Sequence, residues 1–146
     1  MPDVVAEGPN KVPEELSCRF KFMQYDILEP QPVKGAAIYF FRAIFHNWLD
    51  KNCVQILQNQ IPALKPGARL VINDSCLHEP DTLPATIERK RRSMDLNMLT
   101  YFGSREKTVA DWETILKEAD PRFHLRSVTR PSYDMNCVLD VEWRGQ

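Results

Sequence analysis

The chain has 146 residues, which fits one domain, and its formal net charge at pH 7 is −1. So small a charge excludes a global electrostatic attraction to nucleic acid or anionic lipid. No run approaches the roughly 20 consecutive apolar residues of a membrane span. The N-terminal stretch MPDVVAEGPNKVPEEL lacks the charged and apolar parts of a signal peptide.

Cysteine and histidine spacing gives little support to a metal site. The four cysteines, Cys18, Cys53, Cys76 and Cys137, are far apart, have no CxxC spacing, and do not cluster with the three histidines. We therefore expect no metal. Cysteines within otherwise apolar runs indicate reduced, buried thiols, as in a cytoplasmic protein.

The N-terminal third predicts one helix and two strands. Residues 2–7 have helical character, and Gly8-Pro9-Asn10 is a stop signal. Residues 19–25 alternate polar and apolar side chains, which predicts a strand that ends at Asp26. Residues 36–42 are almost continuously apolar, which is typical of a strand covered on both faces in a parallel sheet.

The middle of the chain predicts a helix, a strand and a second helix. Asp50 can cap a helix over residues 51–64, where apolar side chains recur at helical spacing. Residues 69–73 predict the next buried strand, with Asp74 at its carboxyl end. A long helix is expected over about residues 82–101.

The last third continues this pattern. The basic run Arg89–Arg92 is expected on the solvent side of the long helix. Thr108 and Asp111 resemble a capping box that opens the next helix. Two strands follow, over about 123–129 and 136–143, and we expect them to pair antiparallel.

The order strand, strand, helix, strand, helix, helix, strand, strand predicts an α/β sheet with an antiparallel edge. Ligands of such sheets bind outside the carboxyl ends of the parallel strands. Here those ends carry Asp26, the segment Arg42–Trp48 and Asp74. The polar residues of interest thus follow the strands at the edge where the fold places a site.

His46 directly follows an apolar strand, in the stretch RAIFHNW. The alternative to a catalytic role is a structural one, in which His46 is a core histidine with a satisfied hydrogen bond. Asp74 ends the next strand and Glu106 precedes the capped helix, although each is also explained by a local structural role. A carboxylate beside an imidazole fixes its tautomer and raises its pKa, which suits removal of a proton from a phenol.

Two blocks of the sequence resemble the plant and fungal O-methyltransferases that include the caffeic acid and flavonoid enzymes. The first block reads FRAIFHNWLDKNCVQILQNQIPALKPGARLVINDSCL, and PQPVKGAAIYFFR before the histidine matches as well. Its pattern is a histidine, a helix, a Pro-Gly turn and an apolar strand that ends in an acid. The second block is MDLNMLTYFGSREKTVADWETILKEA, which resembles the family's Met-rich helix, glycine loop and Glu-Arg-Thr helix start. The resemblance covers about residues 2–143.

The resemblance implies roles for matching positions. His46 would be the general base that deprotonates the acceptor hydroxyl, with Asp74 and Glu106 flanking and orienting it. S-adenosylmethionine would be the methyl donor, and no metal is needed when a histidine is the base.

Further positions match the family's cofactor and acceptor contacts. Asp26 and Ile27 match the position at the adenine end of the cofactor, and Arg42 matches a basic residue on its carboxylate or ribose side. Met98 and Tyr101 fall in the helix that lines the acceptor pocket; ordinary core packing is their alternative explanation.

The sequence departs from the family in three ways. Asn47 replaces the usual Asp beside the base, and Asp74 replaces the usual Glu. The third departure is the lack of a GxGxG turn, because no two of the five glycines lie close together. We therefore expect this chain alone to bind S-adenosylmethionine very weakly.

Residues 1–146 thus resemble a partial C-terminal methyltransferase domain, without the family's N-terminal dimerisation domain. The family sheet has the order 3-2-1-4-5-7-6, and the strands expected here correspond to strands 3 to 7, in an incomplete Rossmann-like sheet lacking strands 1 and 2. The strand at 36–42 would then have a bare edge unless strand 3 or another chain covers it. A homo- or hetero-oligomer is therefore a possible partner arrangement.

Three functions follow from these observations. The first is methyl transfer to a phenolic or enolic hydroxyl of a secondary metabolite with polyketide-like character, with the chain active or in need of a partner. The second is a cyclising, pericyclic or dehydrating enzyme on the same scaffold. The third is an inactive or partner-binding relative. Cofactor binding separates the first from the second.

Overall fold

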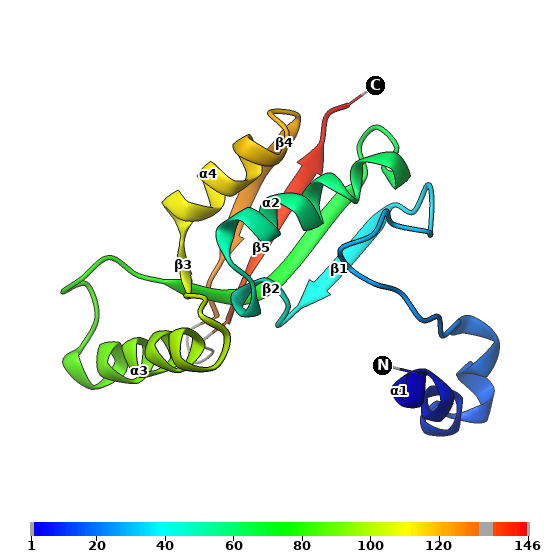
Figure 1. The fold of residues 1–146 in the computed structure, drawn as a ribbon, viewed down its shortest axis with the longest axis horizontal. Helices are drawn as coiled ribbons and strands as arrows, with labels where there is room; N and C mark the ends of the chain where they lie inside the picture. Colours follow the sequence, from blue (N-terminus) through cyan, green and yellow to red (C-terminus); the bar gives the residue numbers. More distant parts are fainter. Residues whose placement is uncertain (1, 132–135, 146) are drawn as a thin grey trace.

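The computed structural model describes residues 2–131 and 136–145 (Figure 1). The helices are α1 (Pro2–Glu7), α2 (Asp50–Gln58), α3 (Ala85–Phe102) and α4 (Val109–Ala119). The strands are β1 (Ile38–Arg42), β2 (Arg69–Leu77), β3 (Lys107–Thr108), β4 (Phe123–Thr129) and β5 (Asn136–Trp143). Short 3₁₀ turns are η1 (Gly8–Lys11), η2 (Glu14–Arg19), η3 (Phe45–Asn47) and η4 (Ile61–Ala63).

The sheet has the order β1-β2-β5-β4, with the two-residue β3 beside the end of β2. β1 and β2 are parallel, whereas β5 is antiparallel to both β2 and β4. This order equals the 4-5-7-6 end of the family sheet, so the α/β class with an antiparallel edge is confirmed. The register places Arg42 beside Asn73, so the first residue after β1 lies level with Asp74.

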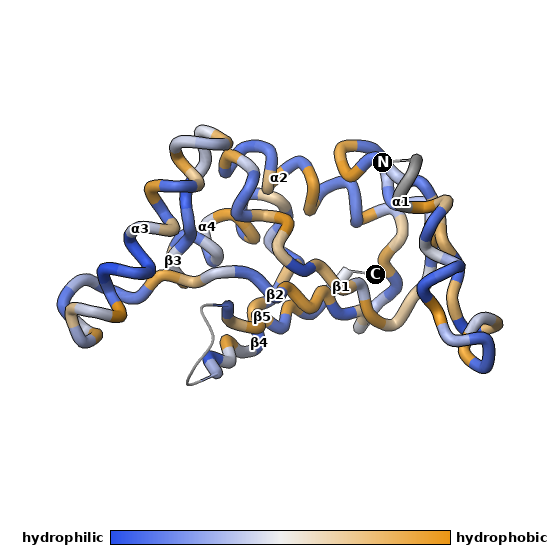
Figure 2. The backbone as a smooth tube through the Cα atoms, turned by 90° about the horizontal axis from the view of Figure 1, so that it is seen from below, coloured by the Kyte–Doolittle hydropathy of each residue, from blue (hydrophilic) through white to orange (hydrophobic). Residues whose placement is uncertain are grey.

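Helices α2 and α4 pack side by side over the same face of the sheet (Figures 1 and 2). Each contributes buried side chains at helical spacing, for example Ile56 and Leu57 from α2 and Trp112 and Leu116 from α4. Phe45, in η3, is fully buried and its ring lies 5.3 Å from that of Trp112. The turn that carries His46 is therefore anchored in the core by its neighbouring phenylalanine.

The capping box predicted for α4 is confirmed. The Thr108 hydroxyl accepts a hydrogen bond from the Asp111 backbone, and the Asp111 carboxylate accepts one from the Thr108 backbone at 2.8 Å. This reciprocal pair satisfies two donors that a helix start otherwise leaves open. It also fixes the backbone position of Glu106 and Lys107, which directly precede the capping residue Thr108.

The predicted strand over residues 19–25 is wrong. Arg19 ends the turn η2, and the residues that follow lie in no strand, with Phe20, Phe22 and Met23 largely exposed. Alternating side chains favour a strand only where a neighbouring strand offers hydrogen bonds and a face to cover. Among the described residues, no strand pairs with this segment.

The outer edge of β1 has no partner strand among the described residues. This agrees with the expectation that counterparts of the family's strands 1 and 2 are lacking here. β1 pairs only with β2 in the described part of the chain. Its side chains alternate: Tyr39 and Phe41 are buried against the helices, but Ile38 and Phe40 are 59% and 62% exposed. The expected cover on both faces of β1 is therefore wrong, because in the described residues both packed helices lie on one side (Figure 2).

Other boundaries shift for local reasons. Helix α2 ends at Gln58 rather than at residue 64, and a 3₁₀ turn containing Pro62 follows, because proline supplies no N–H to continue a helix. Part of the basic run is not on the solvent side: the Arg91 and Arg92 guanidinium groups donate to backbone carbonyls of Cys76 and His78. Within the described residues, no helix combines the length and apolar character that crossing a membrane requires.

Candidate active site

The structure brings together the three residues proposed for proton transfer, which come from three separate segments. His46 lies in η3 after β1, Asp74 lies in β2, and Glu106 directly precedes β3. The His46 Nδ1 atom lies 3.6 Å from Asp74 Oδ1 and 3.5 Å from Glu106 Oε1. Both carboxylates are about 99% buried, whereas the imidazole remains partly open to solvent. One nitrogen of the ring thus faces two buried acids.

Asp74 also holds the backbone of the turn that carries the imidazole. Its Oδ2 atom accepts hydrogen bonds from the Phe45 and His46 amides at 2.8 and 3.3 Å, and Oδ1 accepts one from the Ser75 amide at 3.0 Å. Burial raises the pKa of Asp74, while the nearby imidazole and these hydrogen bonds oppose that effect. The shorter acid at this position therefore reaches both the ring and the backbone.

Glu106 is held through its backbone, and its carboxylate is free to serve the imidazole. The Glu106 amide donates to Asp95 Oδ1 at 2.8 Å. Both carboxylate oxygens are buried, and neither accepts a well-formed hydrogen bond from any residue in the described ranges. A buried carboxylate with unused acceptor capacity stabilises a positive charge beside it.

The interaction with Glu106 is the largest cause of a raised His46 pKa. Burial of the ring opposes the rise, the charge of Asp74 adds to it, and the charge of Lys107 reduces it. Because Nδ1 faces the acids, its proton is retained there and Nε2 carries the lone pair. Among the described residues, none hydrogen-bonds to Nε2. Nε2 is therefore the ring nitrogen that the two acids leave free.

Glu106→Gln is expected to lower the pKa of His46, because the amide cannot balance the imidazolium charge. A raised pKa stabilises the fold below the unfolded value of about 6.5, and the benefit disappears as pH rises through the folded value. The variant should therefore lose stability mainly at acidic pH. NMR titration of the imidazole C–H signals measures the change, and the exposed Glu113→Gln is the matched control. An unchanged His46 titration would contradict the assignment.

Lys107 is a residue of the site that sequence reasoning missed. Its side chain is 1% exposed, and Nζ donates to the carbonyls of Phe45, Trp48 and Arg105 at 3.1 to 3.2 Å. Asp50 Oδ1 lies 3.8 Å from the same nitrogen. The ammonium group therefore joins the turn of His46 to the loop of Glu106. The only signal in the sequence is a lysine between the acid and the capping threonine.

Ser104 makes a second link between the same two segments. Its hydroxyl is placed 2.5 Å from the carbonyl of His46 and 3.5 Å from that of Met98. Gly103 permits this approach by ending α3 in the left-handed conformation, with φ of 63°. Met98, which was predicted to line the acceptor pocket, is buried, and the Ser104 hydroxyl links its backbone carbonyl to that of His46.

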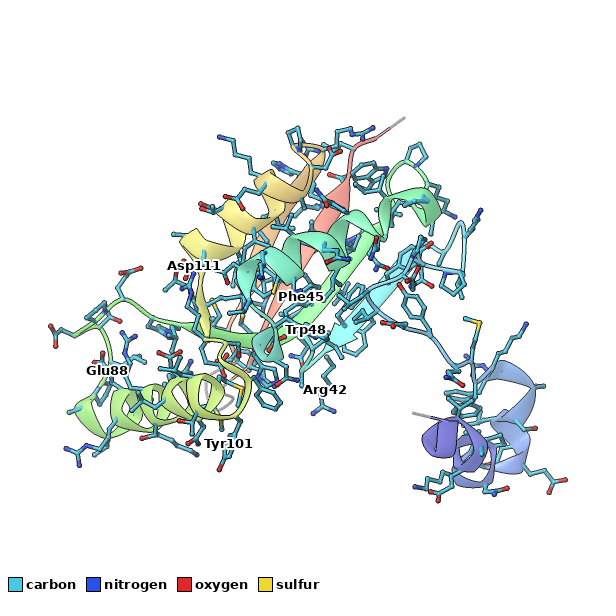
Figure 3. All side chains as sticks on the ribbon, viewed as in Figure 1. Arg42, Phe45, Trp48, Glu88, Tyr101 and Asp111 are labelled. Atoms are coloured by element: carbon cyan, nitrogen blue, oxygen red, sulfur yellow. The ribbon has the colours of Figure 1, made fainter. Side chains whose placement is uncertain are left out.

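The other predicted residues lie outside this cluster of contacts. Tyr101 is 73% exposed and its ring meets Phe102, pointing away from the sheet (Figure 3). Asp26 is exposed and caps its own turn by accepting from the Leu28 amide, while Ile27 packs against the core. Arg42 projects from the end of β1 and forms no ion pair with a described residue (Figure 3).

The three catalytic candidates also have the donor types of a metal site. Their ligand atoms lie within 4.8 Å of one another. The sequence-based expectation of no metal stays a prediction.

Comparison with known sequences places the chain in a family. The sequence model of the O-methyltransferase domain matches residues 1–121. The grayanic acid biosynthesis cluster O-methyltransferase of Cladonia grayi is 45% identical over 135 residues, 92% of this chain and 30% of that protein. The O-methyltransferase pyvH of Aspergillus violaceofuscus is 42% identical over 127 residues, 87% of this chain and 30% of that protein. The chain spans about 30% of the length of these curated relatives.

Solved structures agree with the fold. The structure of OxaC in complex with sinefungin and meleagrin matches with a TM-score of 0.76 and 29% identity, over 96% of this chain and 34% of that one. LepI in complex with SAM matches with a TM-score of 0.81 and 24% identity, over 99% of this chain and 35% of that one, a likeness that concerns the fold alone. By sequence and by fold, the chain belongs to the O-methyltransferase domain family.

Proposed function

We propose that this chain supplies the proton-removing part of an O-methyltransferase, with His46 as the general base. The observation that carries the proposal is the position of His46 Nδ1 between the buried carboxylates of Asp74 and Glu106. These acids hold the ring by one nitrogen and stabilise the imidazolium that forms when Nε2 accepts a proton. General-base catalysis of this kind contributes about 10²- to 10⁴-fold to a rate.

The proposed acceptor is a phenolic or enolic hydroxyl of a secondary metabolite. A phenol ionises near pH 10, within reach of an imidazole whose pKa is raised. Leu49 and Leu99 are exposed apolar side chains in a hollow that Asp50, Gly103, Ser104 and Arg105 also line, and the Ser104 hydroxyl bonds the His46 carbonyl. An aromatic body would pack against such leucines. The curated relative from Cladonia grayi is named for a biosynthetic cluster, which supports this substrate class.

The residues present fit only part of the cofactor. S-adenosylmethionine, when bound, would supply the methyl group. Arg42 is exposed at the end of β1 without an ion-pair partner in the described residues, which fits the cofactor's carboxylate or ribose side. Asp26 and Ile27 are proposed for the adenine end. The five glycines are widely spaced, so the glycine-rich cradle has to come from residues outside these 146, either of a longer protein or of another chain.

A chimera tests the proposal. These 146 residues replace the corresponding part of the Cladonia grayi O-methyltransferase, which supplies the rest of the domain. The chimera is expected to bind S-adenosylmethionine in calorimetric titration and to methylate that enzyme's acceptor, whereas the isolated chain binds it very weakly. A folded chimera that binds the cofactor but leaves the acceptor unmethylated would contradict the proposal and favour a non-methylating or inactive role.

A further inference from the structure

Two cysteines lie diagonally across neighbouring strands, close to the catalytic candidates but with no part in the proposed proton transfer. Cys137 in β5 lies directly opposite Asp74 in β2, and Cys76 lies two residues further along β2. Side chains two residues apart on a strand share one face, so Cys76 and Cys137 are diagonal neighbours on the face that the helices cover. Both are about 98% to 99% buried. All four cysteines of the chain are free thiols in the structure.

The surroundings of the two sulfurs differ. Arg130 Nη2 donates to Cys76 Sγ at 3.5 Å, and Arg91 Nη1 donates to the Cys76 carbonyl, also at 3.5 Å. The Cys137 thiol donates to the Asp74 carbonyl at 3.4 Å. Cys76 Sγ therefore has a guanidinium donor at 3.5 Å and a weak contact to the Leu77 carbonyl at 4.0 Å, whereas Cys137 donates to the Asp74 carbonyl.

This asymmetry separates the acidities of the two thiols. The neighbouring Cys137 thiol and the guanidinium of Arg130 lower the pKa of Cys76 to about 7, against burial, and the charge of Arg91 acts in the same sense. The neighbouring Cys76 sulfur, together with burial, raises the pKa of Cys137. For buried Cys53, burial outweighs the opposing effect of Lys107 and raises the pKa to about 11. A lowered pKa increases the share of Cys76 that is thiolate at neutral pH, whereas Cys137 stays a thiol, and the thiolate is the form in which a dithiol reacts.

We propose that Cys76 and Cys137 form an oxidisable dithiol in which Cys76 is the nucleophile and a hydroperoxide is the oxidant. The Cys76 thiolate attacks the peroxide, an S–O bond forms, the O–O bond breaks, and hydroxide leaves. Cys137 then loses its proton and attacks the Cys76 sulfur, so that an S–S bond forms and the S–O oxygen leaves as water. Sulfur is oxidised by two electrons and the peroxide is reduced by two.

The position of the two cysteines predicts a disulfide that forms slowly and is easily reduced. Diagonal neighbours on adjacent strands have Cα atoms about 7–8 Å apart, beyond the usual range of disulfides, so the strands must move together. Bonds closed against such resistance have less negative reduction potentials and are readily reduced. Arg130, whose guanidinium contacts the Cys76 sulfur, follows β4 and is itself exposed to solvent.

The experiment uses the full 146-residue chain with Cys18→Ser, which removes the exposed thiol and hence intermolecular linkage. Hydrogen peroxide is added in modest excess at pH 7, and intact and peptide mass spectrometry follow. The expected result is a loss of two hydrogens, reversed by dithiothreitol, in a cross-linked peptide pair that contains Cys76 and Cys137. No linkage, or one that involves Cys53, would overturn the proposal.

Variants assign the nucleophile. With Cys137→Ser, dimedone should trap a sulfenic acid at Cys76, whereas with Cys76→Ser no cysteine should react. Arg130→Met should slow oxidation several-fold at pH 7, and the exposed Arg126→Met should not. Circular dichroism checks that each variant is folded. If the Cys76→Ser protein unfolds, the Arg130 pair decides: equal oxidation rates would overturn the assignment.

Discussion

His46→Ala is expected to reduce kcat of the chimera by about 10²- to 10⁴-fold, because the acceptor hydroxyl would lose the imidazole proposed to accept its proton. The loss should fall on kcat more than on KM, since the imidazole acts as the hydroxyl ionises rather than when the acceptor binds. Cofactor affinity should stay unchanged. Initial rates over a range of pH, with calorimetry for the cofactor, measure both quantities.

The control for this change is His124→Ala, because His124 is exposed on β4 and takes no part in the cluster. The pH dependence of the rate offers a second check, because the acceptor hydroxyl ionises at high pH without a general base. The deficit of His46→Ala should shrink as pH rises toward the pKa of the acceptor, since hydroxide then replaces the base. A deficit that is constant across pH would indicate that His46 shapes the site rather than removes the proton.

Local sequence patterns predicted much of the fold. The spacing of Cys53 and Leu57 identifies the buried face of α2, and Thr108 with Asp111 identifies the start of α4. These signals are reliable because the partners lie within a few residues of one another. The segment over residues 19–25 had an equally regular pattern and forms no strand, since strand formation depends on a neighbour that only the tertiary structure supplies.

The candidate site was predictable in its composition but not in its support. His46 and Glu106 stand out because they lie next to predicted strands and helices, and Asp74 stands out because it follows the apolar run 69–73, although β2 continues through it to Leu77. Their contact depends on the parallel register of β1 and β2, which places the end of one strand level with Asp74. Lys107 gave no comparable signal, because burial of a lysine is decided by the carbonyls that surround it.

Lys107→Met is expected to lower the free energy of unfolding by about 3 kcal/mol, since three buried carbonyls would lose a charged donor. The methionine fills a similar volume, so the loss reports the ammonium group rather than a cavity. The turn of His46 would also separate from the loop of Glu106, which weakens the imidazole–carboxylate contact. Urea unfolding measures the first effect, and NMR titration of His46 measures the second.

Lys107→Arg separates position from charge. The family pattern has Glu-Arg-Thr where this chain has Glu106-Lys107-Thr108, so an arginine should restore most of the stability and the normal titration of His46. The exposed Lys117→Met is the matched control and should change neither quantity. If Lys107→Met lost stability but left the His46 titration intact, the lysine would support the fold without positioning the base. The His46 cluster would then be held by the hydrogen bonds of Asp74 and Ser104 alone.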